Sequence, residues 1–190
     1  MRTLSFLLIT IALAGQPALA AKEVGGVALP TTSAARDGTT LQLNGAGLRT
    51  RFFVSVYVGA LYVEQPSTDA ATLRDTDQTA RMELHFLRDG IEQHQINDAW
   101  RDGLAANNDA EAVAALDDRM IQFLDLTPAD GVDDGDVLAF EYVPGEGTEA
   151  SVNGDPVGMI AGHDFFAALL STWVGDEPPS RRLRAGVLGQ

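Results

Sequence analysis

The sequence predicts a single α+β domain in which helices pack on one face of an antiparallel sheet. Alternating apolar segments come in hairpin-like pairs, two amphipathic helical segments occupy the middle of the chain, and a further helix follows the last strands. Strands and helices that are grouped in this way, rather than alternating one by one, favour antiparallel pairing. The 190 residues include no cysteine, so the stability of the domain must come from its core rather than from disulfides.

The strongest β segment runs from Arg51 to Glu64, where the alternation assigns Phe52 to one face and Phe53 and Tyr57 to the other. Its Gly59-Ala60 pair predicts a break in the strand.

Gly45-Ala46-Gly47 just before this segment predicts a bend or bulge. Asn153-Gly154 is a favoured two-residue hairpin turn. The other predicted strands are Val27 to Leu29, Thr39 to Asn44, Met82 to Leu87, Asp136 to Val143, Glu149 to Val152 and Val157 to Ile160.

Helical periodicity predicts one helix over Ile91 to Ala106 and a second over Ala110 to Leu124, with Asn107, Asn108 and Asp109 supplying the turn and the N-terminal cap between them. A third, broadly apolar helix lies between Gly162 and Gly175, and a short helix that begins at Ser180 ends the chain.

The N-terminal segment predicts export. Arg2, the apolar stretch from Leu4 to Ala14 and the small residues Ala18-Leu19-Ala20 form a secretory signal over residues 1–20, so the mature domain is expected over residues 21–190 and the protein in the periplasm. The formal net charge of −14 disfavours both nucleic acid and an anionic membrane surface as partners. We also expect no stable membrane insertion once the signal is removed.

Generic catalytic signatures are missing from the sequence. It contains no Gly-x-Ser-x-Gly elbow, no His-Glu-x-x-His helix and no phosphate-binding loop of the Gly-x-x-x-x-Gly-Lys type. The acidic run Asp133-Asp134-Gly135-Asp136 lacks the closing glutamate of a calcium loop and is interpreted as an ordinary loop. We therefore predict neither a metal nor a cofactor.

Arg49 is the main candidate site residue. It lies between the glycine-rich segment and the apolar strand, where a partly enclosed guanidinium needs an anionic partner and can offer two parallel donors to a carboxylate. An arginine that merely pairs with a local acid at the edge of the sheet is the alternative. Aromatic side chains serve equally well in a core and in a ligand cavity, so composition alone does not separate the two.

The residues around Arg49 resemble a known family. Asn44-Gly45-Ala46-Gly47-Leu48-Arg49, followed by Phe53 to Val63, resembles the opening motif of chalcone isomerase-like proteins. The apolar helix between Gly162 and Gly175, then Pro178-Pro179 and a basic short helix, resembles the C-terminal end of the same family. The similarity spans Val27 to Gly189 and is greatest to the exported bacterial members.

The resemblance implies an open-faced β-sandwich in which a large antiparallel sheet and a layer of helices enclose a cleft. In the plant enzymes the motif arginine polarises a chalcone during intramolecular ring closure, and in fatty-acid-binding relatives it meets the carboxylate of the ligand. Arg49 matches that arginine. A threonine of the enzymes falls at Tyr57, their hydroxyl residue on the late helix falls at Ala167, and their first-helix tyrosine and asparagine have no secure counterpart between Asp89 and Trp100.

These departures favour binding over catalysis, because positioned donors contribute far more to a rate than to the retention of an apolar ligand. The predicted function is the binding of a fatty acid or similar apolar carboxylate in an apolar cleft beside Arg49, with Tyr57, Phe53, Trp100 and Phe166 as further ligand contacts. One alternative is an isomerase, an intramolecular lyase acting on a small enone, with Arg49 and Tyr57 as its catalytic residues. The other is a noncatalytic accessory protein in a periplasmic assembly.

Overall fold

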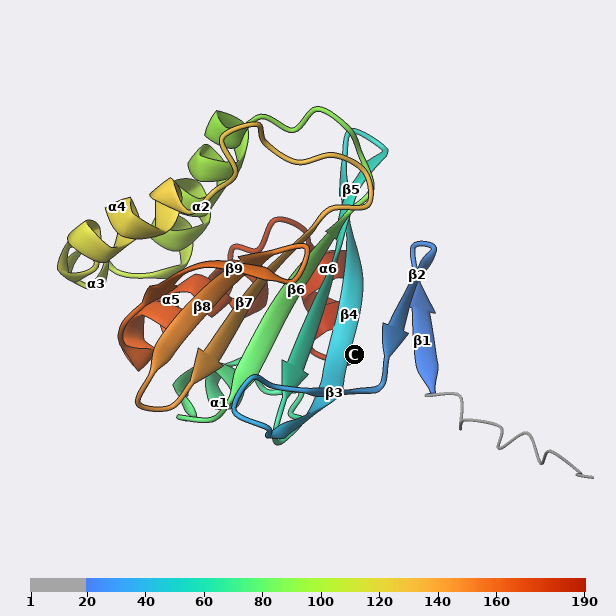
Figure 1. Cartoon of the computed structure of the whole chain (residues 1–190), viewed down its shortest axis with the longest axis horizontal. Helices are drawn as coiled ribbons and strands as arrows, with labels where there is room; N and C mark the ends of the chain where they lie inside the picture. The colour runs from blue at the N-terminus through green and yellow to red at the C-terminus, as the bar shows by residue number, and fades with distance from the viewer. Residues whose placement is uncertain (1–19) are drawn as a thin grey trace, which may run out of the picture.

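A computed structural model describes residues 20–190, so the predicted secretory signal lies outside the described residues apart from Ala20. Seven antiparallel strands form one curled sheet in chain order, β3-β4-β5-β6-β7-β8-β9 (Figure 1). Their bounds are β3 Thr32–Ala34, β4 Thr40–Arg51, β5 Val54–Val63, β6 Ala80–Phe86, β7 Val137–Val143, β8 Gly147–Val152 and β9 Asp155–Ile160. Every neighbouring pair is antiparallel, as the sequence predicts.

The prediction of one strand from Arg51 to Glu64 is wrong at its N-terminal end, because β5 begins at Val54. Arg51 pairs with Val54, so Phe52 and Phe53 form a two-residue turn, and their φ angles are 49° and 66°. The predicted break at Gly59-Ala60 is also wrong, because β5 continues through both residues. A Cβ at Gly59 would lie 2.9 Å from the Met82 Cε, so the glycine serves close packing within the sheet. The predicted bulge is confirmed between Leu43 and Gly45.

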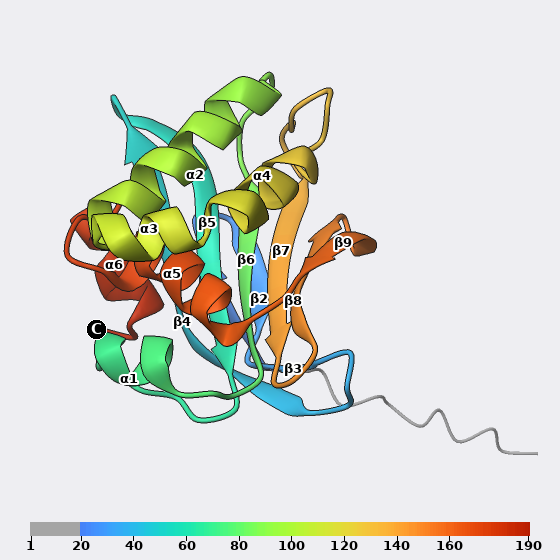
Figure 2. The same ribbon diagram turned by 90° about the vertical axis from the view of Figure 1, so that its left-hand side faces the viewer.

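Six helices are described, and Figure 2 shows them on one face of the sheet. They are α1 Ala70–Asp75, α2 Gln93–Asn107, α3 Ala110–Ala115, α4 Asp117–Asp125, α5 His163–Val174 and α6 Arg181–Val187. The caps at Asp109 and Ser180 are confirmed, since each side chain accepts a backbone N–H of the first turn. The helix predicted over Ala110 to Leu124 is instead two helices that meet at Leu116, and α1 was not predicted. No helix within residues 20–190 is long and apolar enough to cross a membrane.

The main core lies between the sheet and the helices. Five aromatic rings pack at its centre with centroid separations of 5.3 to 6.3 Å, joining α2 and α5 to β7 and α4. The five are Trp100, Phe123, Phe140, Phe165 and Trp173. A cluster of this size buries a large apolar area at the place where the two helices cross the sheet.

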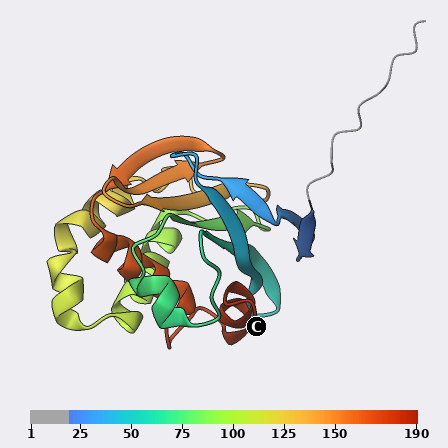
Figure 3. The same cartoon turned by 90° about the horizontal axis from the view of Figure 1, so that it is seen from below.

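A second, smaller core covers the opposite face of β4 and β5. The hairpin of β1 (Ala21–Val24) and β2 (Val27–Pro30) supplies Leu29, which packs with Val58, Ala60 and Tyr62 from β5. Figure 3 shows this hairpin at the outer side of the curled sheet, away from the helices. The cleft described below lies on the other, helical face.

Candidate functional site

A cleft of about 620 Å³ opens on the helical face, between the β4–β5 hairpin and α2. Its walls come from the two strands, from α2, from α5 and from the segment before α6. The lining residues that matter here are Arg49, Arg51, Tyr57, Trp100, Gly103 and Thr172.

The glycine-rich motif explains why the cleft begins at Arg49. Gly45, Gly47 and Arg49 alternate onto the same face of β4, and α6 lies directly on the two glycines. A Cβ at Gly47 would lie 2.5 Å from the backbone oxygen of Leu183, so only glycine permits this approach. Arg49 is the next residue on that face after α6 and is half-buried. The two glycines therefore fix the C-terminal helix and leave the arginine at the edge of the open space.

Arg49 and Tyr57 are direct cross-strand partners in β4 and β5. The guanidinium carbon lies 5.3 Å from the centre of the tyrosine ring, which is the geometry of a cation–π contact. Among residues 20–190, no carboxylate lies within 4.0 Å of the Arg49 guanidinium. The positive charge is thus held in place by a ring rather than neutralised by an acid.

The Tyr57 side chain is buried, and its hydroxyl oxygen is fixed by a hydrogen bond from a neighbouring helix. It accepts a hydrogen bond of 3.0 Å from the indole Nε1–H of Trp173 on α5. Burial raises the pKa of Tyr57, and the nearby Arg49 charge offsets only part of that rise. The phenol therefore stays protonated at neutral pH. The oxygen acts as the acceptor in this hydrogen bond, so the O–H itself remains available as a donor.

Thr172 supplies a second hydroxyl to the same cleft. It is 2% exposed, and its Oγ1 has no hydrogen-bond partner within the described part of the chain. Gly103 on α2 faces it so closely that an added Cβ would lie 2.4 Å from the threonine Cγ2. The glycine therefore lets α2 and α5 pack closely at the threonine. A buried hydroxyl without a partner is costly unless a ligand or water satisfies it.

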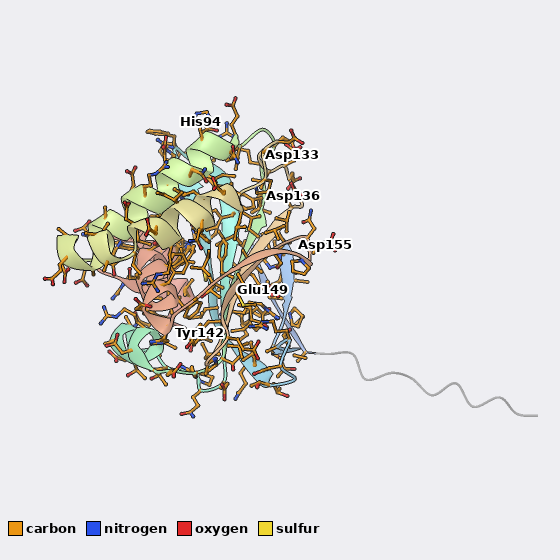
Figure 4. All side chains as sticks on the ribbon, turned by 60° about the vertical axis from the view of Figure 1, so that its left-hand side comes forward. His94, Asp133, Asp136, Tyr142, Glu149 and Asp155 are labelled. Carbon is orange, nitrogen blue, oxygen red and sulfur yellow. The ribbon has the colours of Figure 1, made fainter. Side chains whose placement is uncertain are left out.

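The α2 wall is apolar in its middle and charged at its rim. Ala99, Gly103 and Ala106 lie on one face of the helix beside the Trp100 ring and leave a shallow strip of small residues. His94 lies near the beginning of α2, where Figure 4 shows it at the outer end of the molecule. The remaining rim is acidic, from Asp98, Asp102 and Glu177.

The structure brings together three of the five predicted site residues. Arg49, Tyr57 and Trp100 line the cleft. Phe53 lies instead at the tip of the β4–β5 hairpin and is fully exposed, and Phe166 is buried against Tyr142 with ring centroids 5.3 Å apart. Neither is among the residues that line the cleft.

The cleft differs from the predicted apolar one in two respects. Its lining is mixed, because charged side chains form the rim, and the aromatic cluster fills the space beneath its floor. The late-helix hydroxyl residue of the enzymes matches Ala167, which has no hydroxyl, but Thr172, five residues further along α5, is among the residues that line the cleft. The sequence held a signal for this residue, since Ser171-Thr172 is a polar pair inside an otherwise apolar helix.

The acidic run before β7 is a loop, as interpreted from the sequence. Figure 4 shows Asp133 and Asp136 close together there, and the Asp136 carboxylate accepts the backbone N–H of Asp133 at 2.7 Å. The Asp133 carboxylate accepts the backbone N–H of Gly90 at 2.8 Å. These side chains therefore hold neighbouring loops in place. Over residues 20–190, no group of three or more histidine and acidic side chains has the arrangement of a metal site.

Comparison with solved structures shows the fold. A crystal structure of a fatty-acid binding protein from Arabidopsis thaliana superimposes with a TM-score of 0.64 at 14% sequence identity. The alignment covers 83% of this chain and 95% of the plant protein. No curated protein matches the sequence. At this identity the likeness concerns the architecture, which is the chalcone isomerase-like arrangement of a curled antiparallel sheet and helices.

A protein-family model extends the likeness to the sequence. The model described as "Chalcone isomerase-like" matches residues 21–189, which include the whole sheet, all six helices and the Arg49 motif. The chain belongs to the chalcone isomerase-like family.

Proposed function

We propose that this protein binds a fatty acid or a similar apolar carboxylate in the cleft, with the head group at Arg49. One observation carries the proposal. Arg49, Tyr57 and Thr172 line one cleft, and none of the three has an acidic partner among the hydrogen bonds and ion pairs of the described residues.

The three donors suit a carboxylate in kind and in number. A guanidinium offers two parallel N–H groups to the two oxygens, and two hydroxyl groups supply the further donors that a partly buried anion needs. Hydrogen bonds to a charged group are each worth about 1.5–3 kcal/mol. The raised pKa of Tyr57 supports this role, because only the protonated phenol can donate.

The charges at the rim set the direction of the ligand. Asp98, Asp102 and Glu177 repel a carboxylate from the α2 side, so the head group is expected at the strand side beside Arg49. The apolar chain would then lie along Trp100 and the small residues of α2. The cleft volume of about 620 Å³ lies within the range of small-molecule sites. The fatty-acid binding named for the plant protein of similar fold supports the same ligand class.

A displacement titration tests the proposal. A fluorescent fatty acid is bound to the protein and displaced with palmitate, and the affinity is compared between wild type and Arg49→Met. Loss of the guanidinium should weaken binding about tenfold or more, because a charge-assisted hydrogen bond is removed from a partly buried site.

Arg101→Met is the matched control. Arg101 lies on α2 with an exposed side chain and only a long contact of 3.7 Å to Asp98. It should leave the affinity unchanged. Equal affinities for wild type and Arg49→Met, or a wild-type protein that does not bind the probe, would reject the proposal.

Catalysis of ring closure in a chalcone-like enone is a second candidate function. The presence of Thr172 among the residues that line the cleft favours it. With Arg49 and Tyr57, Thr172 completes a set of one cation and two hydroxyl groups that could stabilise a developing enolate oxygen. Loss of chalcone absorbance would be followed with wild type and with Thr172→Val. A wild-type rate equal to the uncatalysed background would remove this candidate.

We also propose that the protein acts after export. The basic, apolar and small-residue order of residues 1–20 supports this location. The intact mass of protein recovered from the periplasm should correspond to a chain that begins at Ala21, and a mass that retains residues 1–20 would contradict cleavage there.

A further inference from the structure

The tip of the β4–β5 hairpin carries the two most exposed large apolar side chains of the described residues. Phe52 is 84% exposed, Phe53 is fully exposed, and Val54 beside them is 48% exposed. In Figure 2 the tip stands clear of α2 at the upper left of the molecule. Two adjacent, unpacked phenylalanines at the apex of a protruding hairpin are unusual, because water-exposed rings of this size cost solvation free energy.

The backbone at the tip makes this arrangement more costly still. Phe52 and Phe53 both have positive φ, a region that bulky residues rarely adopt and that glycine and asparagine prefer. A turn that selection had tuned only for folding would carry the smaller residues. Strained positions of this kind mark places where the side chains themselves are needed.

The charges around the tip indicate the kind of partner. Arg49 and Arg51 are the only ionisable residues other than Tyr57 between Leu48 and Val58, in a chain of net charge −14. The Arg51 guanidinium lies 5.6 Å from the Phe52 ring centre, and no acid lies within 4.0 Å of it in the part of the chain that the structure describes. Two exposed phenylalanines next to two arginines match the interface of a phospholipid bilayer, where acyl chains lie beneath phosphate groups.

We propose that the Phe52–Phe53 tip inserts reversibly into the surface of a phospholipid membrane. A fluid bilayer accepts a convex apex without a matching pocket, whereas a protein partner would need one. The net negative charge of the chain opposes close approach to phosphate groups elsewhere, so attachment through the tip is weak. This inference rests in part on the proposed function. Arg51 also lines the cleft, so insertion brings the cleft mouth to the head groups, where an apolar acid can enter without crossing water.

Flotation with vesicles of phosphatidylethanolamine and phosphatidylglycerol tests the inference. The exported protein is used, with its mass checked so that an uncleaved signal cannot act as an anchor. Wild type should float with the vesicles, and Phe52→Asn/Phe53→Gly should lower the partition coefficient about tenfold or more, since two large apolar side chains are lost. Because asparagine and glycine are the preferred residues of this turn, the variant keeps its fold.

A second pair of exposed apolar residues provides the matched control. Ile121→Ser/Met159→Ser removes side chains that are 54% and 44% exposed on α4 and β9, and vesicle binding should not change. As a direct readout of depth, the emission that Phe53→Trp adds to that of Trp100 and Trp173 in wild type should shift to the blue with vesicles and be quenched by brominated acyl chains. A wild type that stays with the soluble fraction, a tip variant that floats like wild type, or a tryptophan that remains in water would overturn the inference.

The result can be separated from the proposed function. Palmitate affinity in solution should be the same for wild type and the tip variant, because neither phenylalanine lines the cleft. Vesicle binding without any palmitate binding would reject the proposed ligand and leave the membrane contact in place. Palmitate binding without vesicle binding would reject the membrane contact and leave the proposed ligand in place.

Discussion

The β4–β5 and β8–β9 hairpins have two-residue turns of the same kind, but the turn residues differ in how well they suit that geometry. In each, the residues flanking the turn pair directly, Arg51 with Val54 and Val152 with Asp155. Both turn residues have positive φ in each case, 49° and 66° at Phe52-Phe53 and 53° and 87° at Asn153-Gly154. The second pair is the residue choice that this geometry favours, and the first is among the least suited. One turn is therefore specified locally, and the other is imposed by its strands.

The contacts around the two turns explain the difference. The Asn153 amide accepts the backbone N–H of Val137 at 2.8 Å and donates to Asp136 at 2.9 Å, so this turn is bound to the neighbouring strand. The phenylalanines at the other tip face solvent. That hairpin is held lower down, by the Tyr57–Trp173 hydrogen bond and by α6 lying on Gly47. Strong anchoring at the base permits an unfavourable apex.

Exchanging the residues of the favourable turn should have the largest effect. Asn153→Phe/Gly154→Phe places two bulky residues at positive φ and removes the Asn153 hydrogen bonds, so the free energy of unfolding should fall by about 3–5 kcal/mol. Urea unfolding at equilibrium measures it. A loss below about 1 kcal/mol would show that turn chemistry matters little in this sheet.

The reverse exchange should stabilise the protein. Phe52→Asn/Phe53→Gly relieves strain at the tip, and the free energy of unfolding should rise by about 1–3 kcal/mol. The same urea titration measures the change, with Ile121→Ser/Met159→Ser as the control for lost exposed apolar surface. Destabilisation by the tip exchange would mean that the phenylalanines are needed for folding rather than for an external contact.

The anchor at the base of the β4–β5 hairpin can be weakened alone. Tyr57→Phe leaves the indole N–H of Trp173 buried without its acceptor, so the free energy of unfolding should fall by about 1–2 kcal/mol. Calorimetry can measure this together with palmitate affinity, which should also fall. Unchanged stability would show that the hydrogen bond does not hold the hairpin.

The smallest expected effect is a pH dependence of the stability that Asp136 contributes beside the β8–β9 turn. The backbone N–H of Asp133, and then the Asn153 amide, lower the pKa of Asp136 below its ordinary value of 3.8. A carboxyl whose folded pKa is depressed adds stability above its unfolded pKa and loses it as pH falls through the folded value. The stability difference between wild type and Asp136→Asn should therefore shrink as pH falls below 3.8. A difference that is constant with pH would exclude this linkage.

The regular elements of the fold could be predicted where local pattern and tertiary structure agree. Alternation identified the strands of β6 to β9, and helical periodicity identified α2 and α5, because each element shows the core a single face. The errors lie where tertiary contacts override local preference. Phe52 and Phe53 continue an alternating apolar pattern, and nothing local marks them as a turn. Gly59 was interpreted as a break although it serves close packing against Met82.

The site could be predicted only through the strand that carries the motif. Arg49 was found from its place between the glycine-rich motif and an apolar strand, Tyr57 from its match to a threonine of the similar enzymes, and Trp100 as a large ring on the first predicted helix. Thr172 was missed because its partnership with Gly103 depends on how α2 and α5 cross, which no single segment encodes. Phe53 and Phe166 were included for ring size, a property that core, cleft and surface share.

Indole NMR offers the most direct test of a carboxylate held at Arg49 and Tyr57. The protein has two tryptophans, of which Trp100 lines the cleft and Trp173 donates to the Tyr57 hydroxyl. Saturating palmitate should shift both indole N–H resonances, while the alcohol of equal chain length should shift that of Trp100 more than that of Trp173. In Arg49→Met the Trp173 response to palmitate should disappear. Identical Trp173 shifts with acid and alcohol, or no shift with either, would contradict a head group at this site.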